Sequence, residues 1–155
     1  MKIGLMVYSQ TGHTLTVAKK LQAKLSAAGH VVNLEQVQAV GHVRPNATDV
    51  KLATRPDTEP YDGLVFGSPV QGGALPPAMR CYLEQIPSLQ GKRVALLLTH
   101  LFPSGWGTNQ TLEKLTEICE SKGATICAAG DVRWFSLTRR RQIASVVEKL
   151  GKLFA

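Results

Sequence analysis

Five short apolar runs along the chain predict the strands of a sheet. They are Ile3–Tyr8, Val31–Leu34, Gly63–Gly67, Val94–Thr99 and Thr125–Ala129. Most of them lack the alternation of apolar and polar residues that marks a strand with one face in water. Short continuous apolar runs are typical of strands covered on both faces in a parallel sheet.

Between these runs, apolar residues recur at helical spacing. Gly29 and Gly123 supply stop signals, and Pro76 and Pro77 suit the first turn of a helix. The repeating strand–helix order predicts an α/β class with a doubly wound, five-stranded parallel sheet. The apolar helix faces are Ala18, Leu21, Leu25 and Ala28; Met79, Tyr82, Leu83 and Ile86; Leu112, Leu115 and Cys119; and Ile143, Val147, Leu150 and Phe154.

The segment Val37–Pro60 is polar, contains prolines and has the weakest pattern. We expect one short helix around Thr48–Ala53. The chain shows no internal repeat, low-complexity stretch or linker, so residues 1–155 are predicted to form a single domain.

Composition excludes several classes of protein. With 44% apolar and 19% charged residues, the chain is typical of a globular core rather than a disordered one. No apolar run approaches the roughly 20 residues that a membrane span needs. The N-terminus reads directly into the first strand, which argues against a signal peptide. The three cysteines form no CxxC motif and are predicted to be small buried residues in a reducing cytoplasm.

The net charge of +7 leaves an acidic partner, a nucleic acid or a membrane surface open. Aromatic residues are few, so the stacking surface of a single-strand binder is not visible and a nucleic acid is disfavoured. The densest basic run is Arg139–Arg141, with Arg133 nearby. It is either a solvated helix start, where cations oppose the helix dipole, or a docking patch for an acidic surface.

In a doubly wound sheet, ligands bind beyond the carboxyl ends of the strands where strand order reverses. The first loop there reads "SQTGHT", Ser9–Thr14. The hydroxyls of Ser9, Thr11 and Thr14 can donate hydrogen bonds, and Gly12 lets backbone amides converge. The positive end of the following helix adds to them, so the loop suits a phosphate. The alternative is a helix start capped by Ser or Thr.

Three phosphate-handling classes are disfavoured in this loop. It has neither the lysine nor the GxxxxGK[ST] pattern of a P-loop, and no GxGxxG dinucleotide motif. A phospho-accepting receiver domain would need acidic residues where Ser9 and Ser68 stand.

The same loop matches the pattern [ST]-x-T-G-x-[ST] of the flavodoxin family, which holds the phosphate of FMN in that family. The resemblance runs strand by strand over the whole chain. The fifth strand has no long insertion, so the chain resembles a short-chain flavodoxin. The resemblance implies strand order 2-1-3-4-5 and FMN as cofactor. It places Ser9, Thr11, Gly12 and Thr14 on the phosphate, assisted by the backbone amides of Gln10 and His13.

The resemblance also implies that the loops after strands three and four hold the flavin ring. In "SPVQGGALPP", the adjacent Gly72 and Gly73 would let a peptide flip beside the ring; a plain Gly-Gly turn is the alternative. In "THLFPSGWGTNQ", Trp106 is the first candidate for stacking on the ring and Phe102 the second. The site residues expected from these loops are Ser68, Pro69, Val70, Gln71, Gly72, Gly73, Thr99, His100, Leu101, Phe102, Gly105, Trp106 and Gly107.

Two details separate the chain from typical members. Flavodoxins are usually acidic around the flavin, whereas these two loops contain no Asp or Glu. A nearby carboxylate opposes reduction by roughly 1 kcal/mol in water-like surroundings, so we expect a less negative second one-electron potential than an acidic flavodoxin has. "GWGTNQTL" also resembles a loop of flavodoxin-like NAD(P)H:quinone oxidoreductases. Trp134, after strand five, is expected to pack against the last helix.

These observations leave three functions. The favoured one is an FMN-binding electron carrier between a reductase and an acceptor protein, and acidic docking surfaces on those redox partners would suit the positive charge of the chain. An FMN-dependent NAD(P)H:quinone-type oxidoreductase is the alternative that would make the chain an enzyme. The third is a cofactor-free module that binds through Arg133 and Arg139–Arg141. The sequence suggests no catalytic acid–base set and no metal site; Tyr8 and His100 are assigned buried or capping roles.

Overall fold

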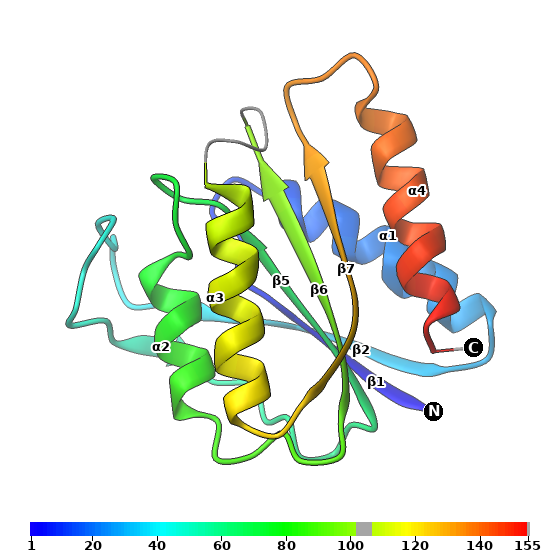
Figure 1. Ribbon diagram of the computed structural model, residues 1–155, viewed down its shortest axis with the longest axis horizontal. Coiled ribbons are helices and arrows are strands. Elements are labelled where there is room, and N and C mark those ends of the chain that lie inside the picture. Colours follow the sequence, from blue (N-terminus) through cyan, green and yellow to red (C-terminus); the bar gives the residue numbers. More distant parts are fainter. Residues whose placement is uncertain (102–106, 155) are drawn as a thin grey trace.

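The computed structural model describes residues 1–101 and 107–154 and contains a five-stranded parallel sheet (Figure 1). Its order is β2-β1-β5-β6-β7, which is the predicted 2-1-3-4-5 order once the two short strands β3 and β4 are set aside. The five predicted strands are therefore confirmed, each starting within one residue of its expected start. Their bounds are β1 (Lys2–Val7), β2 (Val31–Gln36), β5 (Gly63–Pro69), β6 (Arg93–His100) and β7 (Thr125–Arg133).

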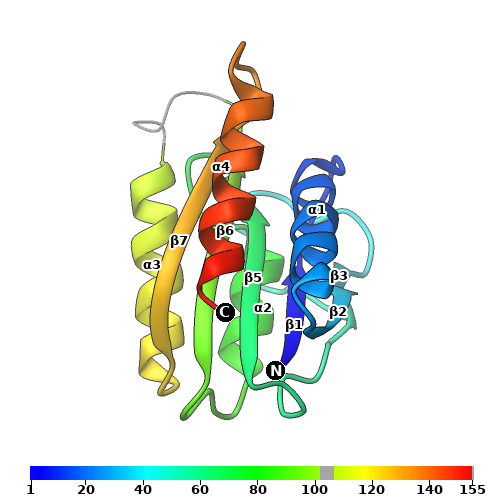
Figure 2. The same ribbon diagram turned by 90° about the vertical axis from the view of Figure 1, so that its right-hand side faces the viewer.

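Two pairs of helices cover the two faces of the sheet (Figures 1 and 2). Helices α1 (His13–Ala27) and α4 (Arg139–Lys152) lie on one face. Helices α2 (Pro77–Gln85) and α3 (Thr108–Ser121) lie on the other. The four helices are those that the apolar spacing predicts, but three of the expected face residues lie beyond the helix ends. Ala28 is the exposed C-cap of α1, Ile86 is the buried C-cap of α2, and Phe154 is buried after the end of α4.

The three central strands β1, β5 and β6 lack alternation because both of their faces are buried. In β6, Leu96 points into the core under α2 and α3, while the next residue, Leu97, points into the core under α1 and α4; both are fully buried. Burying a leucine side chain contributes roughly 1.5–3 kcal/mol, so a central strand with apolar residues on both sides fixes its position in the sheet.

The expected helix around Thr48–Ala53 is wrong. Strand β3 (Gln38–Ala39) pairs antiparallel with β4 (Leu52–Thr54) instead. Thr54 ties the pair together: its Oγ1 accepts a hydrogen bond from the Gln38 amide at 2.8 Å and donates one to the Gln36 carbonyl at 2.6 Å. The side chains of Leu52 and Val50 pack against the core beside α2, and this burial outweighs local helix propensity.

The cysteines match the prediction only in part. Cys119 is fully buried, but Cys81 and Cys127 are partly exposed; all three are free thiols. Cys127 lies on β7, which is an edge strand of the sheet, and Cys81 lies on α2. None of the described helices is long and apolar enough to cross a membrane.

Burial raises the pKa of the Cys119 thiol to about 12, so almost none of it is the reactive thiolate at pH 8. We expect iodoacetamide at pH 8 to alkylate Cys81 and Cys127 in the native protein and to leave Cys119 unmodified until denaturant is added. Mass spectrometry of tryptic peptides measures each thiol. Equal rates of alkylation at all three thiols of the native protein would contradict the burial of Cys119 on α3.

Candidate functional site

The carboxyl ends of β1, β5 and β6 surround a cavity of about 240 Å³. It lies at the edge where strand order reverses, between β1 and β5. The structure thus brings together residues from all three loops that the sequence singles out. The lining residues are Ser9, Gln10, Thr11, His13, Thr14, Pro69, Val70, Gln71, Gly72, Thr99, His100 and Leu101.

The remaining candidates lie around this cavity or outside the described residues. Ser68 is buried at the end of β5, with its hydroxyl donating to the Pro69 carbonyl. Gly12 and Gly107 are the N-cap residues of α1 and α3. The two stacking candidates, Trp106 and Phe102, lie outside the described residues, as does Gly105.

The β1–α1 loop presents a helix start whose N-cap residue has no capping side chain. Gly12 takes a left-handed conformation with φ of +86° at the N-cap and has no side chain with which to cap the helix. The first turn of α1 contains no acidic residue. Ser9 Oγ accepts a long hydrogen bond, 3.4 Å, from the Leu15 amide. An anion at this helix end would therefore meet amide hydrogens and hydroxyls without carboxylate repulsion.

A buried hydroxyl pair joins the first loop to the end of β6. Thr14 Oγ1 and Thr99 Oγ1 are 2.7 Å apart, and both residues are buried. When the Thr99 hydroxyl donates to Thr14, the Thr14 hydrogen is free to reach toward the cavity that both residues line. The pair therefore positions one of the predicted phosphate ligands.

The glycine pair after β5 forms a tight hairpin turn. Gln71 and Ala74 exchange two backbone hydrogen bonds, of 2.9 and 3.0 Å. Gly72 and Gly73 stand between them with φ of +57° and +76°. Positive φ at both central residues defines the mirror-image turn that favours glycine. A plain Gly-Gly turn, the alternative considered from the sequence, is therefore sufficient to explain why both residues are glycine in this conformation.

Beside this turn, the cavity contains an acceptor without a partner. Gln71 Oε1 is buried and forms no hydrogen bond with any described residue. An unsatisfied buried acceptor costs roughly 1–3 kcal/mol, and an N–H group of a bound molecule would satisfy it. The unpartnered oxygen and the helix start, which carries no acidic residue, are both compatible with a ligand that has an anionic group and an N–H donor.

The loops after β5 and β6 touch through their backbones. Gly107 has φ of +104°, and a Cβ added there would stand 2.1 Å from the Gly73 carbonyl oxygen. On the other side of the turn, a Cβ on Gly72 would lie 3.6 Å from Pro45 Cβ. The loop after β6 therefore leaves no room for a side chain at Gly107 beside Gly73, whereas the Gly72 side of the turn is less crowded.

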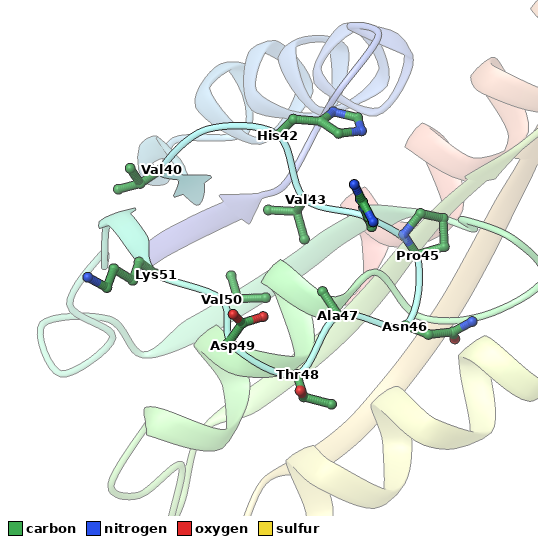
Figure 3. Close-up of a pocket in the computed structure, with 11 residues that line it drawn as sticks. Val40, His42, Val43, Pro45, Asn46, Ala47, Thr48, Asp49, Val50 and Lys51 are labelled. Atoms are coloured by element: carbon green, nitrogen blue, oxygen red, sulfur yellow. The ribbon is translucent and has the colours of Figure 1, made fainter.

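A second cavity, of about 540 Å³, is enclosed by the connection between β3 and β4 (Figure 3). A single segment, residues 40–51, lines it, and Val43, Ala47 and Val50 stand along that segment. It is larger than the cavity at the strand ends, but it receives no side chain from the ends of the parallel strands. We therefore assign the functional site to the smaller cavity.

His100 lines the cavity and pairs with Asp131, a carboxylate that the sequence analysis did not identify. His100 Nε2 lies 2.7 Å from Asp131 Oδ2; the histidine side chain is 5% exposed and that of Asp131 46%. Asp131 lies beyond the expected end of strand five at Ala129, because β7 continues to Arg133. The hydrogen bond from His100 is the main reason why the pKa of Asp131 lies below its usual value.

The Asp131 pair predicts an acid-dependent loss of stability. A carboxyl with a lowered pKa stabilises the fold above its unfolded-state pKa, near 4, and loses that contribution as pH falls through its folded pKa. We expect Asp131→Asn to lower the free energy of unfolding at pH 7 by no more than about 1 kcal/mol, because the group is half exposed. The difference from the unmodified protein should vanish near pH 2. Urea denaturation between pH 2 and pH 7 measures it, and a constant difference would argue against the ion pair.

Two stacked rings and a guanidinium link the first loop to the start of α4. The rings of His13 and Trp134 are stacked, with centroids 4.1 Å apart and an interplanar angle of 12°. The Arg139 guanidinium carbon stands 4.6 Å from the Trp134 centroid. Burial, and then the charge of Arg139, lower the pKa of His13, which keeps the imidazole neutral near pH 7. Trp134 packs with α4 as predicted, but its contact with His13 had no signal in the sequence.

Among the described residues, no group of three or more His, Cys, Asp or Glu side chains could hold a metal ion. The site therefore offers hydroxyls, amides, one imidazole–carboxylate pair and apolar walls. Such a set can bind and orient a ring system with an anionic tail.

Comparison with known proteins supplies a family. A family model described as "Flavodoxin domain" matches residues 5–152. Among curated proteins, the NAD(P)H quinone oxidoreductase YCP4 of Candida albicans is 31% identical over 84 residues. That match covers 49% of this chain and only 29% of the length of the Candida protein.

Solved structures share the fold at low identity. A flavodoxin from Streptococcus pneumonia TIGR4 matches with a TM-score of 0.69 and 16% identity, over 98% of this chain and 99% of the other. A short-chain flavodoxin associated with a bacterial microcompartment matches at 0.71 and 16%, over 99% and 95%. A flavoprotein in complex with FMN from Lactobacillus acidophilus matches at 0.67 and 15%, over 94% and 97%.

Proposed function

The chain belongs to the flavodoxin family, and from this premise we propose that it binds FMN at the ends of β1, β5 and β6 and carries electrons between a reductase and an acceptor protein. The observation that carries the proposal is the convergence in one cavity of an uncapped helix start, clustered hydroxyls and the orphaned Gln71 oxygen. A solved flavoprotein of the same fold is described as a complex with FMN.

The phosphate would be held by Ser9, Thr11, Gly12 and Thr14, with the backbone amides of Gln10 and His13 contributing further hydrogen bonds. The flavin ring would lie between the loops after β5 and β6, where Gln71 Oε1 can accept a hydrogen bond from a ring N–H. FMN, when bound, supplies one- and two-electron transfer, and the protein supplies its position and electrostatics.

Direct reduction by NAD(P)H, followed by transfer to a quinone, is the second candidate. It is favoured by the 31% identity to part of a Candida quinone oxidoreductase and by the absence of carboxylates from the two flavin loops. We propose the cytoplasm as the compartment, because the three thiols are free.

Calorimetry of the folded apoprotein with FMN and with riboflavin tests the proposal. We expect heat and a 1:1 stoichiometry with FMN, and much weaker binding of riboflavin, which lacks the phosphate. NADPH is then added to the yellow complex under anaerobic conditions: rapid bleaching without a reductase selects the oxidoreductase, and slow bleaching selects the carrier. A folded apoprotein that refuses FMN would reject both and leave a cofactor-free binding module.

The electrostatics of the site predict its second one-electron potential. The two loops contain no carboxylate, but the structure places Asp131 beside the site, where it pairs with His100. We expect the second potential to be less negative than that of a flavodoxin with acidic flavin loops, because each unpaired carboxylate nearby opposes reduction by roughly 1 kcal/mol. A spectroscopic redox titration measures it. Asp131→Asn should shift the second potential upward only slightly, and a strongly negative second step would contradict the electrostatic argument.

A further inference from the structure

The connection between β7 and α4 exposes two large apolar side chains among cations. Phe135 is 61% exposed and Leu137 108%, so Leu137 projects fully from the surface. Arg133, Arg140 and Arg141 are exposed beside them, and none forms a salt bridge with a described residue. We call these five residues the β7–α4 patch.

Hydrogen bonds from Gln142 and Arg139 order the loop that carries the patch. Gln142 Oε1 accepts a hydrogen bond from the Arg133 amide at 2.8 Å, and its amide nitrogen donates to the hydroxyls of Ser136 and Thr138 at 3.1 and 3.0 Å. Arg139 donates to the Trp134 carbonyl and covers its ring. A binding surface that is ordered before it meets a partner loses less entropy on association.

The patch is unfavourable for the isolated chain. Three arginines occupy the first turn of α4, where positive charge opposes the helix dipole, and that turn contains no acidic residue. Leaving Phe135 and Leu137 in water forgoes their burial. These local costs would be offset by a partner that brings negative charge to the helix start and covers the two apolar side chains.

The patch also adjoins the proposed FMN site. The β7–α4 loop rises at the same edge of the sheet as the end of β6 (Figure 1). Trp134, next to Phe135, stacks on His13, which lines the cavity. A protein seated on the patch would therefore lie close to the mouth of the cavity.

We propose that the β7–α4 patch is the docking surface for an acidic redox protein. Its carboxylates would pair with Arg133, Arg140 and Arg141, and its apolar surface would receive Phe135 and Leu137. This inference rests on the proposed function and specifies the partner's chemistry: acidic, with an apolar centre.

A protein fits the patch better than a lipid surface does. Two projecting side chains bury less hydrocarbon than a single myristoyl chain, which by itself gives only marginal membrane binding. Transient redox complexes typically bury less than about 1,200 Å² of surface, so a small patch is sufficient for one. Opposite charges raise the association rate of such a complex at low salt.

Stopped-flow oxidation of the FMN-loaded, photoreduced protein by the acidic haem protein cytochrome b5 tests the proposal. We expect Arg140→Ala/Arg141→Ala to lower the bimolecular rate constant at low salt about tenfold and to flatten its fall with ionic strength. The matched control is Lys19→Ala/Lys20→Ala, which removes the same two charges from the net +7 at exposed positions outside the patch that form no salt bridge with a described residue. It should change the rate less than threefold.

Phe135→Ser/Leu137→Ser should retain the salt dependence and weaken the complex, with complex affinity measured by NMR titration. Equal effects of the arginine and lysine double variants, or no loss of affinity in the apolar variant, would overturn the proposal. Sedimentation with phosphatidylserine vesicles that is lost in the apolar variant would assign the patch to a membrane instead. The NMR titration also works on apoprotein, so failure to load FMN rejects the proposed function without deciding the docking surface.

Discussion

Gly107→Ala is expected to lower the free energy of unfolding by about 3 kcal/mol and to reduce FMN affinity at the same time. The new Cβ would stand 2.1 Å from the Gly73 carbonyl oxygen, which is backbone and cannot rotate away. The residue would also have to keep φ of +104°, a conformation that side chains disfavour. Overpacking and backbone strain each cost roughly 1–3 kcal/mol. Relief of the clash would move the Gly72–Gly73 turn that walls the cavity.

Gly91→Ala is the matched control for this change. Gly91 also has positive φ, +74°, but no described atom lies within 4 Å of the added Cβ. It should therefore show only the conformational cost, about 1 kcal/mol, and leave FMN affinity unchanged. Urea denaturation and fluorescence titration with FMN measure the two quantities. If both variants lose the same stability, the two flavin loops are not in contact.

The fold could be predicted because the central strands are covered on both sides. Continuous runs such as Val94–Thr99 leave little choice other than a buried parallel strand. The polar segment 37–60 had no such constraint. Its short antiparallel pair depends on Thr54 and on tertiary burial of Leu52, which local spacing cannot reveal.

The site was predictable where its chemistry lies on one loop. The hydroxyls and glycine of Ser9–Thr14 are adjacent in sequence, so a phosphate-binding role for this loop can be suggested from the sequence alone. Contacts between loops had no such signal: Thr14 and Thr99 are 85 positions apart, and Asp131 meets His100 only because β7 lies beside β6. The expected end of strand five at Ala129 also hid Asp131, because Gly130 and Asp131 interrupt the apolar run while the strand continues to Arg133.

Thr14→Val is expected to weaken FMN binding by about 100-fold while leaving riboflavin binding nearly unchanged. A hydrogen bond to a charged group contributes roughly 1.5–3 kcal/mol, and in the proposed site the Thr14 hydroxyl would donate one to the phosphate. Valine matches threonine in shape, so the loop should keep its fold. However, the change also breaks the 2.7 Å bond to Thr99, and that loss must be separated from the loss of the phosphate contact.

Thr99→Val makes that separation, because it breaks the same hydroxyl pair from the other side and retains the Thr14 hydroxyl. Both variants leave one buried oxygen without its partner, so their stabilities in urea should fall by similar amounts, about 1–3 kcal/mol. Their FMN affinities should differ by about tenfold or more, with Thr14→Val the weaker, and their riboflavin affinities should agree. Equal FMN affinities would mean that Thr14 acts only through Thr99 and that the phosphate is held by the other hydroxyls and the amides of the loop.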